Sequence, residues 1–119
     1  MIAGIGVDVV DLARFERAIG RTPRLAERLF TPAERMLPVR SLAARFAAKE
    51  ALIKALGGSD GVGWHDLEVV GSEAGAPRFA DHEALAALFA DRGIRAAHLS
   101  MTHDAGIACA FVVLDGAGS

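Results

Sequence analysis

Residues 40–58 read RSLAARFAAKEALIKALGG and form the longest regular pattern in the chain. Ala and Leu, which are strong helix formers, dominate this segment. The segment stops at Gly57 and Gly58, and glycine is typical of the position just after a helix C-terminus. The pattern therefore predicts a helix from about Arg40 to Leu56, around which the rest of the chain is expected to pack.

Four charged residues lie along this helix beside its apolar stripe. On a helical wheel of about 100° per residue, Arg45 and Lys49 fall inside the apolar arc, while Glu50 and Lys54 follow each other along its edge. A single cation could extend past apolar surface, and a Glu–Lys pair at this spacing contributes only about 0.3–0.5 kcal/mol. Because four charges gather here, we interpret them as the lining of an anion or metal site. The apolar arc itself comprises Leu42, Phe46, Leu52, Ile53 and Leu56.

An acid interrupts the apolar N-terminal segment. Residues Ile2–Val10 are β-branched and glycine-rich without helical spacing, which predicts a strand. Asp8 lies within this strand, either as a solvent-facing residue near its end or as a functional acid. Gly4 and Gly6 would allow close approach of a neighbouring segment or a ligand.

A second polar face is expected near the C-terminus. Alternation puts His98, Ser100 and Thr102 on one face of a strand and Leu99 and Met101 on the other. His103 is expected in the following turn, where it is either simply solvated or a donor to a phosphate. Local signals predict the remaining elements. In the N-terminal half they are a helix capped by Asp11, a break at Gly20 and Pro23, a short helix over Leu25–Leu29 and a capping-box helix at Thr31–Glu34. In the C-terminal half they are strands Leu67–Val70 and Arg78–Ala80, a helix capped by Asp81 and closed by Gly93, and a strand Gly106–Leu114.

Length and composition favour one globular domain over residues 1–119, with 52% hydrophobic residues. The single cysteine, Cys109, excludes a disulfide framework within the chain. No apolar run reaches the length of a membrane span and no signal peptide is evident, so a cytoplasmic protein is expected. Charge is polarised: Leu12–Lys54 carries ten Arg or Lys against four Glu, within a net charge of −2. A basic surface of this kind favours an anionic partner.

Three motifs then occur in order: Gly4-Ile5-Gly6-Val7-Asp8, Arg45-Phe46-Ala47-Ala48-Lys49-Glu50-Ala51 with Lys54 and Ala55, and Ser100-Met101-Thr102-His103. Together they closely resemble holo-acyl-carrier-protein synthases, the short class of 4′-phosphopantetheinyl transferases. The resemblance implies an α+β fold with a small antiparallel sheet packed against a long helix, assembled as a homotrimer with sites between subunits. It also implies that a serine hydroxyl of an apo acyl carrier protein, serving fatty-acid or polyketide synthesis, attacks the β-phosphate of coenzyme A and releases adenosine 3′,5′-bisphosphate.

The resemblance also implies roles for individual residues. Asp8 and Glu50 match acids that bind Mg²⁺, an ion that commonly takes only one or two carboxylates. With Lys54 they form the expected catalytic group, and the general base stays open between Glu50 and a metal-bound water. Longer relatives carry a second acid where this chain has Val10, so water is expected to replace that ligand. Contacts to coenzyme A are implied for Arg45, Lys49, Lys54, Gly57, Ser100, Thr102 and His103.

An arginine pattern outside the family motif suggests where the carrier binds. The residues are Arg14, Arg17, Arg21, Arg24 and Arg28, at steps of three, four, three and four. These five residues, the arginine stripe, would share one helical face, although Gly20 and Pro23 interrupt the helix. A solvated amphipathic face is the alternative. Because the implied partner is acidic, we predict that the arginine stripe docks the carrier.

Two other classes of function are weighed against this hypothesis. A non-catalytic nucleotide- or phosphate-binding module would need the cations but not the paired acids Asp8 and Glu50. An RNA-binding protein would need exposed aromatic platforms, whereas the chain has six Phe, one Trp and no Tyr, and most of them fall on apolar stripes. No nucleic-acid or membrane partner is therefore expected.

Overall fold

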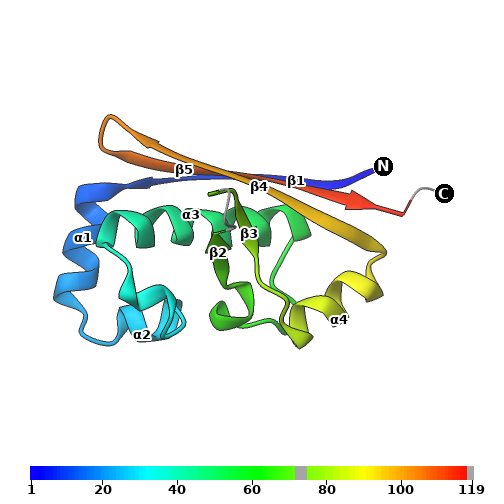
Figure 1. The fold of residues 1–119 in the computed structure, drawn as a ribbon, viewed down its shortest axis with the longest axis horizontal. Helices are drawn as coiled ribbons and strands as arrows, with labels where there is room; N and C mark the ends of the chain where they lie inside the picture. The colour runs from blue at the N-terminus through cyan, green and yellow to red at the C-terminus, as the bar shows by residue number, and fades with distance from the viewer. Residues whose placement is uncertain (72–74, 118–119) are drawn as a thin grey trace.

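The computed structural model describes residues 1–71 and 75–117. A sheet of three antiparallel strands lies along one face of a long helix (Figure 1). Strands β1 (Ile2–Asp11), β5 (Ile107–Gly116) and β4 (Ile94–Asp104) follow one another across the sheet, and the helix is α3 (Val39–Leu56). The expected α+β class, with a small antiparallel sheet packed against a long helix, is confirmed.

The shorter elements lie beside α3 or on its side away from the sheet (Figure 1). They are α1 (Leu12–Arg21), α2 (Leu25–Leu29), the 3₁₀-helices η1 (Glu34–Met36) and η2 (Trp64–Leu67), the antiparallel pair β2 (Val69–Gly71) and β3 (Pro77–Phe79), and α4 (Glu83–Asp91). Two of them, β3 and α4, also contact β4. α1 and α2 lie near one end of the molecule, whereas α4 and both chain termini lie towards the other. No helix in the described ranges has the length and apolar character needed to cross a membrane.

Two glycines let β1 lie directly on α3. A Cβ atom at Gly6 would lie 1.8 Å from the carbonyl oxygen of Ala51, and one at Gly4 would lie 2.2 Å from that of Ala55. The close neighbour expected from these glycines is therefore the helix. Because residues alternate along a strand, Asp8 lies on the same, helix-facing side of β1 as Gly4 and Gly6.

The apolar arc of α3 is only part of its buried surface. The alanines on the sheet side are also buried, because β1 and β5 approach the helix backbone closely. The wheel underestimated this burial, since alanine contributes little to a hydrophobic pattern yet permits close packing. The buried alanines are Ala43, Ala44, Ala47, Ala48 and Ala51, with exposures of 0–5%.

Several expected boundaries hold. Asp11 caps α1, since its Oδ1 accepts from the backbone N–H of Arg14 at 2.8 Å. The chain breaks between α1 and α2, as Gly20 and Pro23 predicted. Thr31 and Glu34 form a reciprocal capping box, although the element that follows is a 3₁₀-helix rather than an α-helix.

Two expectations near the C-terminal half are wrong. His82, not Asp81, precedes the first turn of α4, and neither side chain caps it. β4 extends through His103 to Asp104, so the turn is formed by Ala105 and Gly106, with φ of 52° and 77°. Positive φ at both central residues suits a tight hairpin, and Ala105 gives no sequence signal for such a conformation.

The other face of the sheet carries exposed apolar side chains. Ile5, Val7, Val9 and Phe111 are 45–58% exposed. They alternate with the helix-facing residues of β1 and β5, and no element in the described part of the chain covers them. We call these four residues the apolar sheet face.

Candidate active site

Asp8 and Glu50 line one groove of about 360 Å³, formed by the end of β1, α1 and α3. Asp8 reaches it from the helix-facing side of β1, and Glu50 from α3. Phe15 and Phe46 give the groove an apolar wall, with ring centroids 5.7 Å apart. The groove is also lined by Val9, Val10, Asp11, Arg14 and Ala18. The arrangement places the carboxylates of Asp8 and Glu50 beside apolar surface, and the carboxylate of Asp11 at the same groove is occupied in capping α1.

Lys54 pairs with Asp8 rather than with Glu50. Its Nζ lies 3.0 Å from Asp8 Oδ1 and donates to the carbonyl oxygen of Val7 at 3.1 Å. The i,i+4 spacing on α3 had left an ordinary Glu50–Lys54 pair open. The lysine side chain is 54% exposed, whereas that of Asp8 is 17% exposed. Lys54 thus holds the partly buried acid, and its exposed side chain could still meet an anionic ligand.

Glu50 is the acid whose protonation the groove alters. Burial, and secondarily the negative charge of Asp8, raise the pKa of Glu50 above its usual range, while Lys54 opposes the shift. Two carboxylates that repel across a groove form a donor set suited to a divalent cation, which would remove the repulsion. Within residues 1–71 and 75–117, no group of three or more His, Cys, Asp and Glu side chains is arranged so that it could hold a metal ion. Mg²⁺ fits such a two-carboxylate site, because it retains waters and binds substrate phosphates.

Lys49 lies elsewhere, although it precedes Glu50 in sequence. It is fully buried, and its ammonium donates to Glu34 Oε1 at 2.7 Å and to the carbonyl oxygens of Leu29 and Trp64 at 2.7 and 3.1 Å. No N–H of this ammonium is left for a ligand, so the expected phosphate contact is corrected to a structural role. Glu34 was not predicted as the partner of Lys49, although the capping-box pattern had already given Glu34 a defined place in the structure.

Arg45 lies within α3, whereas Gly57 lies at its C-terminus. The Arg45 Nε donates to the carbonyl oxygen of Val69 at 3.3 Å, so this side chain lies against β2. Burial lowers the pKa of Arg45, and Glu34 opposes that shift. Gly57 ends α3 in a left-handed conformation with φ of 78°, one turn beyond Lys54. Arg45 lines a shallow hollow with Glu68, not the groove of Asp8.

Ser100 and Thr102 lie on the face of the sheet opposite Asp8. Their register partners on β5 are Phe111 and Cys109, which alternate with the helix-facing Ala108 and Ala110. The alternation expected for this strand is therefore confirmed. His103 pairs with Ala108 and shares the helix-facing side of the sheet, but on the far edge strand from Asp8. One chain alone does not bring Thr102 to the acids.

The arginine stripe is exposed over both helices. Arg14, Arg17 and Arg21 lie on α1, Arg24 precedes α2, and Arg28 lies within it. Within the described ranges, none of them has a salt bridge to a carboxylate. Arg14 also lines the groove of Asp8 and Glu50. The stripe thus begins at the candidate site and extends away from it.

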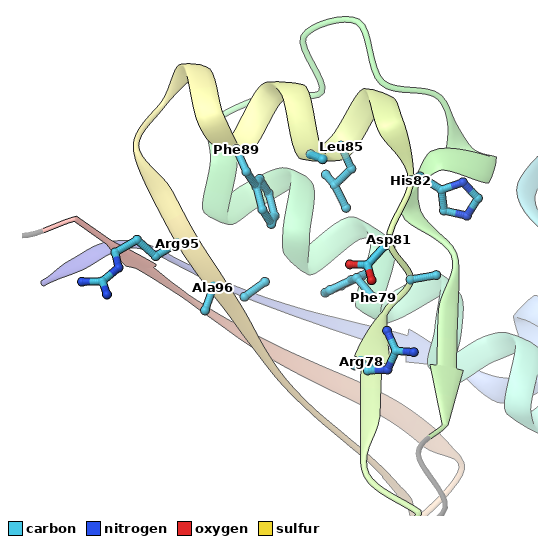
Figure 2. Close-up of a pocket in the computed structure, with 11 residues that line it drawn as sticks. Arg78, Phe79, Asp81, His82, Leu85, Phe89, Arg95 and Ala96 are labelled. Atoms are coloured by element: carbon cyan, nitrogen blue, oxygen red, sulfur yellow. The ribbon is translucent and has the colours of Figure 1, made fainter.

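A second pocket, of about 310 Å³, lies between β3, α4 and β4 (Figure 2). Leu85 and Phe89 point from α4 towards Phe79 and Ala96, which gives it an apolar interior. Arg95 and His82 point away from that interior. Arg78 and Asp81 also line this pocket, but the groove of Asp8 and Glu50 is the better candidate for chemistry, because burial and a neighbouring carboxylate raise the pKa of Glu50 there.

Comparisons with known proteins find relatives that match nearly the whole chain. Residues 4–112 match the family model of the 4′-phosphopantetheinyl transferase superfamily. The chain is 67% identical over 115 residues to a holo-[acyl-carrier-protein] synthase of Leifsonia xyli subsp. xyli, covering 97% of this chain and 98% of that one. A crystal structure of the Neisseria meningitidis synthase has a TM-score of 0.89 at 35% identity, covering 97% and 99% of the two chains. The Helicobacter pylori synthase in complex with coenzyme A has a TM-score of 0.82 at 32% identity, covering 93% and 99%.

Proposed function

The chain belongs to the 4′-phosphopantetheinyl transferase superfamily, and from this premise we propose that it transfers 4′-phosphopantetheine from coenzyme A to a serine of an apo acyl carrier protein. The products are the holo carrier protein and adenosine 3′,5′-bisphosphate. We assign the reaction to the groove of Asp8 and Glu50, because both acids line it and Lys54 pairs with Asp8 there. A module that only binds nucleotides would not need two repelling acids beside the lysine.

The reaction forms one phosphorus–oxygen bond and breaks another. The serine oxygen bonds to the β-phosphorus of coenzyme A, and the bond from that phosphorus to the oxygen bridging to the α-phosphate breaks. The α-phosphate leaves as the 5′-phosphate of adenosine 3′,5′-bisphosphate. The Lys54 ammonium is placed to neutralise phosphate charge, and phosphoryl transfer depends mainly on such positioning and neutralisation. Glu50 is a candidate acceptor for the serine proton, because its carboxylate faces the same groove.

Asp8 and Glu50 would hold Mg²⁺, and the ion would supply further neutralisation of the phosphates when bound. The support is the donor set: two carboxylates facing one groove, with the charge of Asp8 opposing ionisation of Glu50. Val10 lines the same groove where longer relatives have an acid, so this chain provides the smaller ligand set.

The active protein is a homotrimer in this proposal, and the apolar sheet face supports it. Ile5, Val7, Val9 and Phe111 present a contiguous exposed apolar surface, which commonly marks an interface. A closed ring of three copies would cover this surface in every subunit.

A composite site follows from the same packing. Thr102 and Asp8 lie on opposite faces of one sheet, so they can serve one site only if Thr102 comes from another copy. Ser100 lies beside Thr102 on this face, and a neighbouring copy seated there would receive both. Contacts from Ser100, Thr102 and His103 to coenzyme A are proposed to cross the subunit boundary, and Arg45 and Gly57 remain proposed contacts as well. The cytoplasmic location stays a prediction.

The transfer is tested by the intact mass of an apo acyl carrier protein after incubation with the protein, coenzyme A and Mg²⁺. We expect the carrier to gain one phosphopantetheine group, and a carrier with its acceptor serine replaced by alanine to gain nothing. A carrier whose mass is unchanged, with bound coenzyme A demonstrated, would favour the non-catalytic nucleotide-binding module instead.

A further inference from the structure

Lys49 and Glu34 form an ion pair inside the protein, apart from the groove. Their side chains are 0% and 1% exposed, and Lys49 Nζ lies 2.7 Å from Glu34 Oε1. Burial lowers the pKa of Lys49, while its hydrogen bond to Glu34 opposes the shift. The proposed reaction uses neither residue directly, so the burial of two charges requires another explanation.

The pair forms hydrogen bonds to backbone groups from separate segments of the chain. Lys49 donates to the carbonyl oxygens of Leu29, at the end of α2, and Trp64, in η2. Glu34 accepts from the backbone N–H of Thr31 at 3.0 Å and from that of Val69 at 3.0 Å. A simple buried ion pair is often replaceable by apolar side chains, but here the same change would leave four backbone groups without partners.

The segment that the pair holds carries part of the arginine stripe. Leu29 ends the helix that contains Arg28 and follows Arg24. The next residue, Phe30, is fully buried, 5.1 Å from Lys49 Nζ by its ring centroid. Its ring packs edge-on against Phe15, with centroids 6.2 Å apart, and Phe15 lines the groove of Asp8. The pair therefore lies beneath both α2 and the wall of the candidate site.

We propose that Lys49 and Glu34 are positioning residues that fix α2, and with it the arginines that receive the acyl carrier protein, against the helix that carries Glu50. This inference rests on the proposed function. α3 itself is held by its contacts with β1 and β5, so loss of the pair should release the docking helices without moving Asp8, Glu50 or Lys54.

Steady-state kinetics of Glu34→Gln test the proposal. Gln keeps the shape but places an N–H donor where an oxygen now accepts. We expect the apparent KM for the carrier to rise about fivefold or more while KM for coenzyme A stays within about twofold. Leu85→Ala is the matched control, because it removes a buried side chain from α4, remote from Leu29 and Thr31. It should lower the melting temperature without this selective change.

Exchanging the two charges distinguishes hydrogen bonding to the backbone from simple ion pairing between the side chains. Lys49→Glu combined with Glu34→Lys keeps one charge of each sign. The carboxylate at position 49 would then face the carbonyl oxygens of Leu29 and Trp64, and the ammonium at position 34 would face two backbone N–H groups. We expect carrier KM in the exchanged variant to stay at least as high as in Glu34→Gln, and where the variant does not fold, the kinetics of Glu34→Gln alone decide. Wild-type carrier KM in the exchanged variant, or equal increases of both KM values in Glu34→Gln, would overturn the proposal.

Hydrogen exchange of the unmodified protein gives a test that does not depend on catalysis. The amides of Thr31 and Val69 should exchange at least about 100-fold more slowly than unprotected amides, because a buried carboxylate accepts from both. Unprotected amides at these two positions would contradict the positioning role of Glu34. Absence of transfer by the wild-type protein would instead contradict the proposed function, and the hydrogen-exchange result would still test the positioning role separately.

Discussion

Glu50 lies where burial and the charge of Asp8 both oppose its ionisation. A carboxyl whose pKa is raised on folding keeps its proton to higher pH than it does in the unfolded chain. Its contribution to stability is therefore present below the unfolded pKa and is lost as pH rises through the folded pKa. A cation bound between the acids would reverse this loss, since it requires both carboxylates to be ionised.

Mg²⁺ binding should accordingly strengthen as pH rises above the ordinary carboxyl range. We expect saturating Mg²⁺ to raise the melting temperature more at pH 7.5 than at pH 5, because Glu50 must lose its proton before it can bind the ion. Glu50→Gln should lose most of this difference, whereas Asp81→Asn, in an exposed position, should keep it. An equal Mg²⁺ effect at both pH values in the wild type would contradict the role of Glu50.

The contrast between Lys49 and Glu50 shows what residue spacing can and cannot predict. The wheel placed Lys49 inside the apolar arc and Glu50 at its edge, and the family resemblance implied a ligand for each. The structure separates them, because Glu34, fifteen positions earlier, accepts from Lys49 within the core. Angular position on a helix is local information, whereas the partner that covers each side depends on how distant segments fold.

The packing of β1 on α3 depends on the missing side chain at Gly6. A Cβ there would meet the backbone oxygen of Ala51 at 1.8 Å, and backbone atoms cannot rotate away. We predict that Gly6→Ala lowers the free energy of unfolding by about 3 kcal/mol or more. Gly20→Ala is the control, because nothing lies within 4 Å of that position in α1. Chemical denaturation should show Gly20→Ala to be stabilising by about 0.4–1 kcal/mol. Similar stability for both variants would refute the close contact.

The arginine stripe on α1 and α2 should set the encounter with the carrier. Exposed charges act over about 10 Å at moderate salt and affect association more than chemistry. Arg14→Glu combined with Arg21→Glu should raise carrier KM by about tenfold at low salt, weaken its salt dependence and leave KM for coenzyme A nearly unchanged. Arg78→Glu, an exposed arginine on β3, is the matched control. An unchanged carrier KM in the double variant would move the docking surface elsewhere.

At the level of elements, helices with strong patterns were predicted well and strand ends less well. α3 begins one residue before the expected Arg40 and ends at Leu56 as expected, because helix formers and a terminal Gly57 give local signals. β4 extends beyond its expected end because hydrogen bonding to β5 continues to Asp104. Such pairing depends on both strands together, and the residue type of Ala105 does not indicate its left-handed conformation in the turn.

The whole molecule explains why some site residues do not meet. Asp8 and Thr102 lie on opposite faces of the sheet, whereas the sequence gives order along the chain but not which copy supplies each residue. The acids and Lys54 could be predicted as one cluster, and the structure brings them together. The assembly that would complete the cluster remains a proposal based on the apolar sheet face.

Subunit exchange tests this composite site. A Glu50→Gln protein and a protein with both Thr102→Ala and His103→Ala should each be inactive. In mixed trimers, some subunit boundaries join the intact Glu50 side of one variant to the intact Thr102 and His103 side of the other. When equal amounts of the two variants assemble at random, about one quarter of all sites are of this kind. Activity should therefore recover to about a quarter of the wild-type value. Native mass spectrometry would establish that exchange occurred, and mixed trimers without activity would show that each site lies within one chain.

The claim that the acids of the groove carry the transfer is tested most directly by the rate at which Glu50→Gln modifies an apo acyl carrier protein at limiting Mg²⁺. We predict a loss of about 100-fold or more relative to the wild type, because a carboxylate that neutralises phosphate charge and can accept a proton is removed. Circular dichroism should show the fold intact, and Asp81→Asn should transfer at the wild-type rate. A near-normal rate in Glu50→Gln at limiting Mg²⁺ would contradict the account.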